Sequence, residues 1–340
     1  MHPVSLEERV QGEVLMHRRQ LLAGALAAPL VLISFTAQAQ VWPSRNITMI
    51  IPFPPGGQAD LAARPVAAAL EKILGRTVVV DNRQGAGGAI GNAAAARSEP
   101  DGHTLLMTLS SVVILPEADR LFERRPLYEL DQLVPIARVL ADPGVLPVLN
   151  TSPYKTLADL VADAKKRPGQ ITFSSSGNYG AAHVPYEMFQ QAAGIKLQHV
   201  PYRGGGPALA AFLGGQVDIT GQAPGPVKPH VDDGRVRLLA SWGGKRTPEL
   251  ADVPTFIELG YPGVEYYIWA GLFVPKGTPA PVIARLREAM RDIMQDRQVT
   301  SVFEKAGSPP AYLDQPDFVR FIEADAARLI PAVKKIGKLE

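Results

Sequence analysis

Three glycine-rich segments in this chain of 340 residues stand where a strand-like run gives way to a helix-like one. They are IIPFPPGGQADLAAR (50–64), SSSGNYGAAH (174–183) and HVPYRGGGPALAAF (199–212). Glycine lets the backbone approach a ligand closely, and the first N–H groups of a helix lack intrahelical partners, so such loops attract anions. A tight strand-to-helix turn explains the first segment equally well, with Asp60 as an N-terminal cap or first-turn acid.

Two residues of the third segment each have two possible roles. Tyr202 could stack on a ligand or hydrogen-bond to it, or it could be a tyrosine half-buried at a strand end. Arg203 could pair with a carboxylate, or it could be a solvated charge at the rim of a cleft.

The residue pattern gives little support to catalysis. Ser175, His183 and Asp218 could be drawn as a hydrolase triad, but the chain has no G-x-S-x-G elbow. The histidines lack metal-ligand spacing such as H-E-x-x-H. In DNRQGAGGAIG (81–91), Ile90 stands where a dinucleotide-binding loop needs its third glycine, which favours a structural turn or a cleft wall. The sequence therefore predicts no catalytic residue, no metal and no cofactor.

The elements that must position these loops alternate between β-rich and helical runs at steps of about 30 residues, which indicates βα units and largely parallel sheets. Strand-like runs at 46–53, 77–82 and 103–111, with helical runs between them, predict a βαβαβ lobe. A second series of the same kind begins after Pro153, where Thr156 is placed to cap a helix.

Two extended apolar segments, 136–150 and 264–275, bracket the second series and are long enough to cross between lobes as a hinge. Helical patterns that begin near Pro279 and Pro316 should return to pack on the first lobe. We therefore predict lobe 1 from residues 45–140 plus 270–340 and lobe 2 from 146–264.

The N-terminal 39 residues have the pattern of a secretory signal peptide. A basic start precedes an apolar run from 21 to 35, and a small-x-small end predicts cleavage after Ala39. Arg18 and Arg19 also fit a twin-arginine signal. Acidic residues ahead of the basic start make Met16 a candidate for the true initiator.

Charge and composition exclude several classes. The net charge is +2 and no run of Lys or Arg occurs, which argues against a nucleic-acid partner. The absence of cysteine excludes disulfides and thiolate metal sites. A mature chain of about 300 residues exceeds what one hydrophobic core usually covers, so two lobes are expected.

Nine motifs, in order along the chain, resemble the substrate-binding proteins of tripartite tricarboxylate transporters, the Bug-type receptors. They are MIIPFPPGGQADLAARPVAAALEKILG, VVVDNRQGAGGAIGN, PDGHTLLM, FSSSGNYGAAH, HVPYRGGGPAL, LGGQVDI, GRVRLLA, DVPTFIELGYPG and WAGLFVPKGTP. The resemblance implies an α/β, two-lobed type II periplasmic binding protein fold. Each lobe would be a mostly parallel sheet flanked by helices, with two crossing strands as the hinge.

The resemblance also implies how the protein works. It would deliver a small organic acid to a membrane permease of one large and one small subunit, holding the ligand carboxylate through backbone amides and waters. Carried over by motif, the lobe 1 contacts are Phe53, Pro55, Gly56, Gly57, Asp60, Ser110 and Ser111. The lobe 2 contacts are Ser175, Ser176, Gly177, Ala181, His183, Tyr202, Gly204 and Asp218.

The chain departs from the family pattern in places. Pro65 falls in the first turns of the helix behind the first loop, where it should kink the helix. The Asn-Pro expected after SSVVILPEADRLF is missing, and RRPLYELDQLVPI is a residue shorter than the usual link and lacks its Asp-Pro. QAPGPVKPH is rich in proline where a helix start is expected.

The main functional hypothesis is a monomeric periplasmic solute receptor. A sensor subunit, which would present its liganded form to a signalling partner, would have the same residues. An enzyme on the same scaffold is the alternative from a different functional class. Glycines, serines and backbone dipoles without an activated nucleophile favour binding over catalysis.

Overall fold

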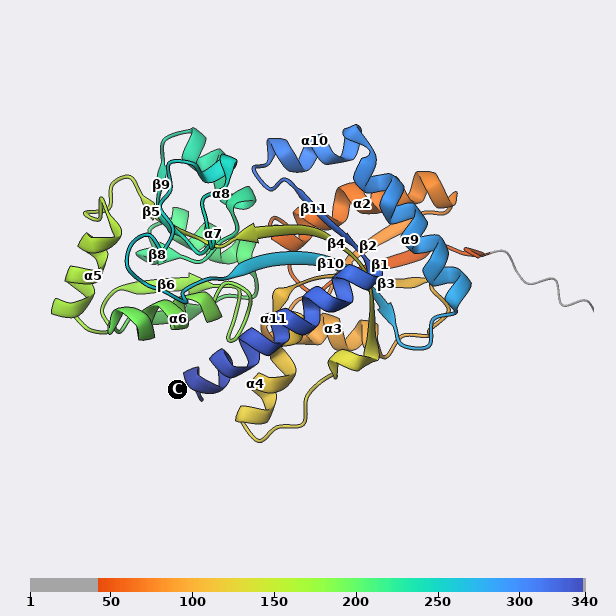
Figure 1. Cartoon of the computed structure of the whole chain (residues 1–340), viewed down its shortest axis with the longest axis horizontal. Helices are drawn as coiled ribbons and strands as arrows, with labels where there is room; N and C mark the ends of the chain where they lie inside the picture. Colours follow the sequence, from red (N-terminus) through yellow and green to blue (C-terminus); the bar gives the residue numbers. More distant parts are fainter. Residues whose placement is uncertain (1–41, 339–340) are drawn as a thin grey trace, which may run out of the picture. The chain divides into compact units, whose positions relative to one another are not determined.

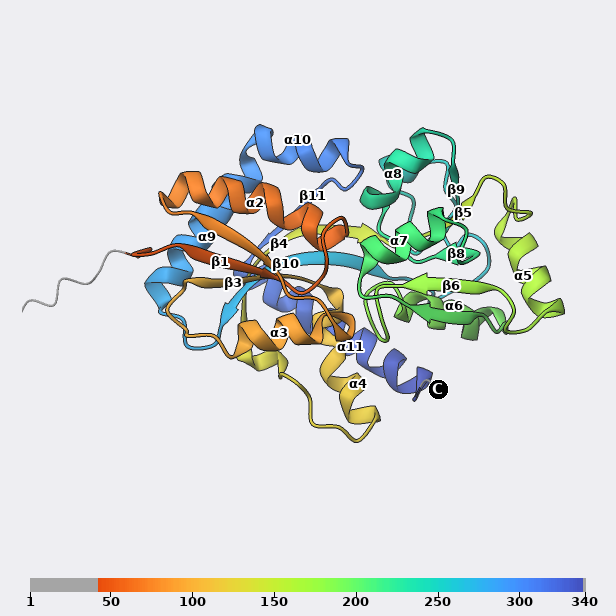
Figure 2. The same ribbon diagram turned by 180° about the vertical axis from the view of Figure 1, so that it is seen from behind.

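The computed structural model describes residues 42–338, so the predicted signal peptide and the alternative start lie outside the described residues. Between these limits no helix has the length and apolar character needed to cross a membrane. The strands form two sheets, which Figures 1 and 2 show joined by the long strands β4 and β10.

The six-stranded sheet has the order β11-β4-β10-β3-β1-β2. Its strands are β1 (Ile47–Ile51), β2 (Val78–Asn82), β3 (Thr104–Leu109), β4 (Leu133–Pro143), β10 (Tyr267–Pro275) and β11 (Pro310–Asp314). The five-stranded sheet has the order β7-β6-β8-β5-β9. Its strands are β5 (Val145–Leu149), β6 (Thr172–Ser175), β7 (Gln198–Pro201), β8 (Ile219–Thr220) and β9 (Val236–Ser241).

We call each sheet with its helices a lobe, the six-stranded one being lobe 1 and the five-stranded one lobe 2. The helices of lobe 1 are α2 (Gln58–Leu74), α3 (Ala89–Ala96), α4 (Leu115–Leu121), α9 (Ala280–Gln295), α10 (Arg297–Lys305) and α11 (Gln315–Ile336). Those of lobe 2 are α5 (Leu157–Lys166), α6 (Val184–Ala193), α7 (Gly205–Leu213) and α8 (Pro224–Asp232). Short 3₁₀ turns are η1 (Ala86–Gly88), η2 (Ser110–Val113), η3 (Leu130–Gln132) and η4 (Pro248–Leu250). The residue boundaries of the two lobes given above from sequence remain a prediction.

Local sequence accounts for several helix ends. Thr156 and Asp159 form a capping box at the start of α5, as the position of Thr156 predicted. Gly75 ends α2 in the left-handed conformation, with φ of 65°. Helix α2 continues through Pro65 to Leu74. Proline-rich QAPGPVKPH does form a helix, α8, in which Pro224 occupies the first position at no cost in intrahelical N–H bonds, while Pro229 lies inside the helix.

The predicted two-lobed α/β fold is confirmed, but both sheets are mixed and not mostly parallel. Strand β1 pairs in parallel with β2 and β3, and β6 pairs in parallel with β7 and β8. The remaining pairs, β3–β10, β10–β4, β4–β11, β5–β8 and β5–β9, are antiparallel. The antiparallel part arises because the chain leaves lobe 1 along β4 and returns along β10.

The two crossing strands are confirmed. Strand β4 pairs with β10 from Pro143 opposite Tyr267 to Leu133 opposite Pro275. After Gly144 the chain enters lobe 2 as β5. This antiparallel ribbon is the continuous connection on which the two lobes are mounted.

Helix α11 packs on β4 in lobe 1 and reaches α6 in lobe 2. Near its end, the Tyr179 hydroxyl donates to the Gly337 carbonyl at 2.5 Å, and Gln191 Nε2 donates to the Lys335 carbonyl at 3.4 Å. The predicted return of the C-terminal helices to lobe 1 is therefore accompanied by contacts to lobe 2.

Replacing Asp325 by alanine should destabilise this packing. Trp269 is fully buried on β10, and its Nε1 donates to Asp325 Oδ2 on α11 at 2.8 Å. The substitution leaves this buried N–H without an acceptor and also removes the partner of Arg328, so the free energy of unfolding should fall by about 2 kcal/mol. Urea unfolding of Asp325→Ala and Asp325→Asn measures this loss. Equal stability of Asp325→Ala and wild type would contradict it.

Candidate functional site

A small cavity lies between the lobes, beyond the carboxyl ends of β1, β6 and β8. It leaves about 20 Å³ for the centres of water molecules. Its lining residues come from both lobes and from the crossing strand β10. They are Phe53, Gly57, Gln58, Ala59, Leu109, Ser176, Ala181, Ala182, Gly205, Gln222, Ala223 and Ile268.

Helix N-termini surround the cavity. Gly57, Gln58 and Ala59 begin the 17-residue helix α2, which has no side-chain cap. Gly205 begins α7, and Ala223 is the N-cap of α8. The first N–H groups of a helix have no intrahelical partner and lie at the positive end of its dipole. The arrangement favours a negatively charged group without any cationic side chain among the lining residues.

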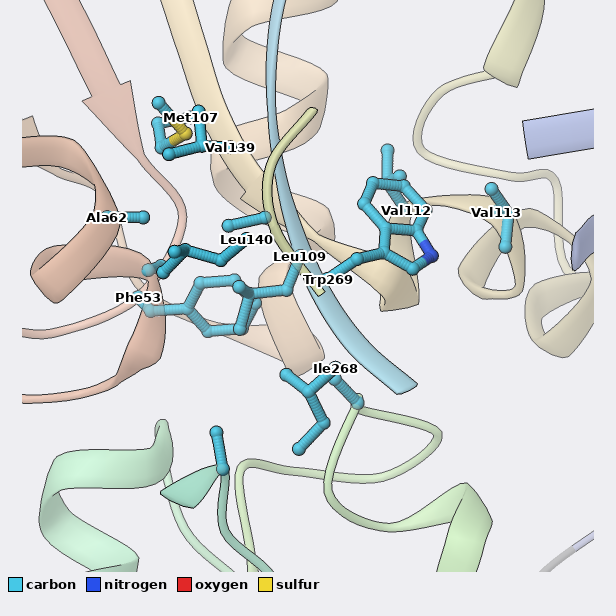
Figure 3. Packing of buried hydrophobic residues seen from close by; sticks show 14 of the residues in the cluster. Phe53, Ala62, Met107, Leu109, Val112, Val113, Val139, Leu140, Ile268 and Trp269 are labelled. Carbon is cyan, nitrogen blue, oxygen red and sulfur yellow. The ribbon is translucent and has the colours of Figure 1, made fainter. Parts of the chain in front are cut away.

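One wall of the cavity is apolar. Phe53, Leu109 and Ile268 gather there, as Figure 3 shows, and each is buried. Phe53 follows β1, Leu109 ends β3 and Ile268 lies on β10. An apolar wall opposite polar backbone groups fits a ligand that has both a charged end and a hydrocarbon part.

Backbone segments of the two lobes touch around the cavity. A Cβ atom placed on Gly206 would lie 2.6 Å from the Pro55 carbonyl oxygen, and one on Gly204 would lie 2.2 Å from Pro54 Cδ. A Cβ on Gly177 would lie 3.1 Å from the Gly87 nitrogen. The structure is thus a closed form, and an organic acid can enter the cavity only after these loops separate.

Four of the predicted contacts line the cavity, namely Phe53, Gly57, Ser176 and Ala181. Ser176 Oγ is buried and has no hydrogen-bond partner among residues 42–338. This hydroxyl is therefore available to a ligand on the lobe 2 side.

Asp60, Ser110 and Ser111 do not line the cavity but hold its loops. Asp60 Oδ2 accepts from the Gly56 N–H at 3.2 Å and from Arg64 Nε at 2.9 Å. The Ser110 hydroxyl lies 3.2 Å from that of Tyr266, and Ser111 Oγ donates to the Gly87 carbonyl at 3.2 Å.

Ser175 and His183 are also inside lobe 2 and fully buried. Ser175 Oγ lies 2.6 Å from His199 Nε2, and the ring of His199 stacks on that of His183 at 3.8 Å between centroids. His183 Nδ1 accepts from the Tyr179 N–H at 2.9 Å. Burial, together with the neighbouring His183, lowers the pKa of His199 to about 3. A half-buried imidazole of such weak basicity suits packing and loop support.

Asp218 is not brought to this group. It is exposed, and its carboxylate accepts from the N–H and the hydroxyl of Thr172 at 2.7 and 2.8 Å. Thr172 begins β6 and Asp218 precedes β8, so both lie at the end of the parallel strands opposite to the cavity. Asp218 therefore does not line the cavity and does not form a triad with Ser175 and His183. It precedes β8, whereas the cavity lies beyond the carboxyl end of that strand.

Other predicted contacts lie around the cavity instead of inside it. Pro55 and Gly56 are exposed on the loop that meets Gly206. Gly177 and Tyr202 line an outer chamber of about 530 Å³ between the lobes, and Gly204 closes against Pro54. Arg203 lines this chamber too, on its solvent-exposed side.

Sequence reasoning missed Gln58 and Gln222, whose amides line opposite sides of the cavity. Gln58 is the first residue of α2, directly after the predicted Gly57. Gln222 follows β8, and its Nε2 donates to the Gly205 carbonyl at 3.0 Å. The rule that ligands lie beyond the carboxyl ends of parallel strands could have found Gln222.

A buried carboxyl group stands behind the cavity. Asp142 on β4 is 3 % exposed and accepts a hydrogen bond from Gln58 Nε2. Burial raises the pKa of Asp142 to about 7, although hydrogen bonds from Ser308 and Gln58 work in the opposite direction. Among residues 42–338 no cluster of His, Asp or Glu is arranged to hold a metal ion.

These features define a class, the two-lobed solute-binding proteins, with a cavity that closes between lobes mounted on crossing strands. Residues 62–338 match the family described as "Tripartite tricarboxylate transporter family receptor". The chain belongs to this family and is a periplasmic solute-binding receptor.

Similar proteins support the assignment. BugT of Bordetella pertussis is 36% identical over 306 residues, covering 90% of this chain and 93% of BugT. The structure of the periplasmic binding protein BugD is 30% identical with a TM-score of 0.81, covering 87% of this chain and 98% of BugD.

Two further similar structures contain ligands. One is Rpa4515 of R. palustris with adipate, which is 30% identical with a TM-score of 0.81. The match covers 87% of this chain and 98% of Rpa4515. The other is MatC of Rhodopseudomonas palustris with bound malate, which is 27% identical with a TM-score of 0.80. The match covers 86% of this chain and 100% of MatC.

Proposed function

We propose that the protein binds a small carboxylate-bearing organic acid in the periplasm and delivers it to a tripartite-type membrane permease of one large and one small subunit. The observation that carries the proposal is the cavity at the starts of α2, α7 and α8, which offers backbone N–H groups to an anion. Adipate and malate in the similar structures are acids of this class. Export through the N-terminal signal, as a monomer, belongs to the same proposal.

The lobes would act by opening on the β4–β10 ribbon and closing over the ligand. Closure removes the acid from water and brings the Ser176 hydroxyl toward the amides of Gly57 and Gln58. The ligand then stabilises the closed form by the contacts that only this form makes.

Organic acids should raise the melting temperature of the purified protein. At about a hundred times its dissociation constant, a ligand stabilises the native state by roughly 2.7 kcal/mol, which corresponds to roughly 5 °C for a protein of this size. A thermal-shift screen of dicarboxylates, tricarboxylates, acidic amino acids and aromatic acids measures the rise. Each active acid is then compared with its methyl ester, which lacks the anchoring charge. Equal shifts with acid and ester would contradict the anion site.

Two measurements separate receptor from sensor and enzyme. Mass spectrometry after incubation should return the bound acid unchanged, and a product formed in stoichiometric amount would favour an enzyme. Co-purification with permease subunits from membranes supports transport, whereas co-purification with a signalling protein in their place supports a sensor.

A further inference from the structure

The side-chain amide of Gln58 is held in one orientation by buried groups behind the cavity. Gln58 is the first residue of α2 and is 5 % exposed. Its Nε2 donates to Asp142 Oδ2 on β4 and lies 3.4 Å from Ser308 Oγ, which precedes β11. The NH₂ group of Gln58 therefore faces Asp142, whose Oδ2 accepts its hydrogen bond.

This orientation turns the amide oxygen away from Asp142, toward the interface of the lobes. Gln58 Oε1 is buried, and no hydrogen-bond partner for it occurs in the described part of the chain. A Cβ placed on Gly225, in the first turn of α8, would lie only 3.3 Å from this oxygen. The oxygen therefore faces lobe 2 as an unused acceptor on a residue that lines the cavity.

A hydroxyl from lobe 2 is also unused. Ser176 lines the same cavity, and its buried Oγ has no partner within the residues that the structure describes. Leaving buried polar atoms unsatisfied is costly, so their presence in a closed cavity indicates that a ligand or a water normally satisfies them. Oε1 of Gln58 can only accept, so its partner must be a donor.

We propose that Gln58 is a specificity-determining residue and that the ligand is an acid with a hydroxyl or ammonium group close to its bound carboxylate. The inference rests on the proposed function, because the carboxylate must sit at the α2 N-terminus for its neighbouring donor to reach Gln58. Asp142 is a positioning residue that fixes the amide. The ligand donor makes the hydrogen bond to this acceptor that a water would otherwise make.

Paired acids that differ only in the donor test the proposal. Isothermal titration would compare malate and aspartate with succinate, and mandelate with phenylacetate. The donor-bearing member should bind about 10-fold more tightly, as expected when a buried acceptor gains its hydrogen bond. Gln58→Met, which keeps the size and removes the acceptor, should bring the ratio near one while the donor-free acid still binds.

Gln222→Met is the matched control, since it removes an amide from the lobe 2 side of the cavity, where its Nε2 bonds to the Gly205 carbonyl. It should weaken both members of a pair by a similar factor and keep the 10-fold ratio. Asp142→Asn provides a second variant, because an asparagine can also donate and frees the Gln58 amide to rotate; the ratio should fall although Gln58 is present.

The outcomes separate the two proposals. If acids bind but wild type shows no preference for the donor-bearing member, or if Gln58→Met keeps the preference, the role of Gln58 is wrong and the carboxylate receptor stands. Gln58→Met could also bind no acid. In that case, an affinity ratio between donor-bearing and donor-free acids that is unchanged in Asp142→Asn overturns the inference. If no acid of any pair binds the wild type, the proposed function fails and this inference fails with it.

Discussion

Gly206→Ala should weaken binding of the organic acid by about 100-fold or more without lowering the stability of the ligand-free protein. Gly206 is the second residue of α7, and a Cβ there would lie 2.6 Å from the carbonyl oxygen of Pro55 in lobe 1. Backbone atoms cannot yield as a flexible side chain can, so the closed form becomes inaccessible. In the open form the same alanine favours the helix by up to about 1 kcal/mol.

Gly205→Ala is the matched control, one residue earlier in the same helix. A Cβ at this position would find Gln222 Oε1 of its own lobe as its nearest neighbour, at 3.4 Å. Its effect on affinity should stay below about 10-fold, since it leaves closure intact. Titration calorimetry with an active acid and thermal melts without ligand measure the two quantities. Wild-type affinity in Gly206→Ala would mean that binding does not require the closed contact.

Asp142→Asn should make the protein more stable at alkaline pH. The pKa of Asp142 is about 7 in the folded protein because of burial, against 3.8 for an ordinary aspartate. The folded state therefore keeps a proton that the unfolded chain releases, and stability that is present below about pH 4 is lost as the pH rises through 7. Asparagine does not titrate. Relative to wild type, the variant should gain on the order of 3 kcal/mol between pH 5 and pH 8.

Ser308→Ala should act in the opposite direction. Its hydrogen bond lowers the pKa of Asp142, so its removal should raise that pKa further and extend the loss of stability to higher pH. Urea unfolding of wild type and both variants at pH 5 and pH 8 gives the comparison. Parallel pH profiles for wild type and Asp142→Asn would show that Asp142 does not titrate in this range.

The loops at the ends of β1 and β6 were predictable from sequence because their signals are local. Proline and glycine after an apolar run mark the end of a strand, and helical spacing follows within a few residues. The loops that contain Gly57, Ser176 and Ala181 were located in this way, and the family resemblance then named these three residues, which line the cavity. The crossing segments were visible for a similar reason, as extended apolar stretches.

The remaining features could not be predicted because they depend on contacts between residues far apart in the sequence. The mixed sheets depend on β10 joining β3 and β4 from more than a hundred residues away in sequence, and no local pattern specifies that partner. Gln58 resembles any polar residue at a helix start until its contact with Asp142 is known. Asp218 lay in a recognised motif, but the pattern did not tell which end of the strand faces the cavity.

The final turn of α11 makes the protein suitable for conversion into an optical sensor. Tyr179 and Gln191 of lobe 2 donate to the carbonyls of Gly337 and Lys335, so separation of the lobes must break these bonds or drag the turn along. The chain contains no cysteine, and one introduced at Lys338 would be the sole thiol for an environment-sensitive dye. Its emission would then follow closure directly and turn the receptor into a reagent for measuring its own ligand.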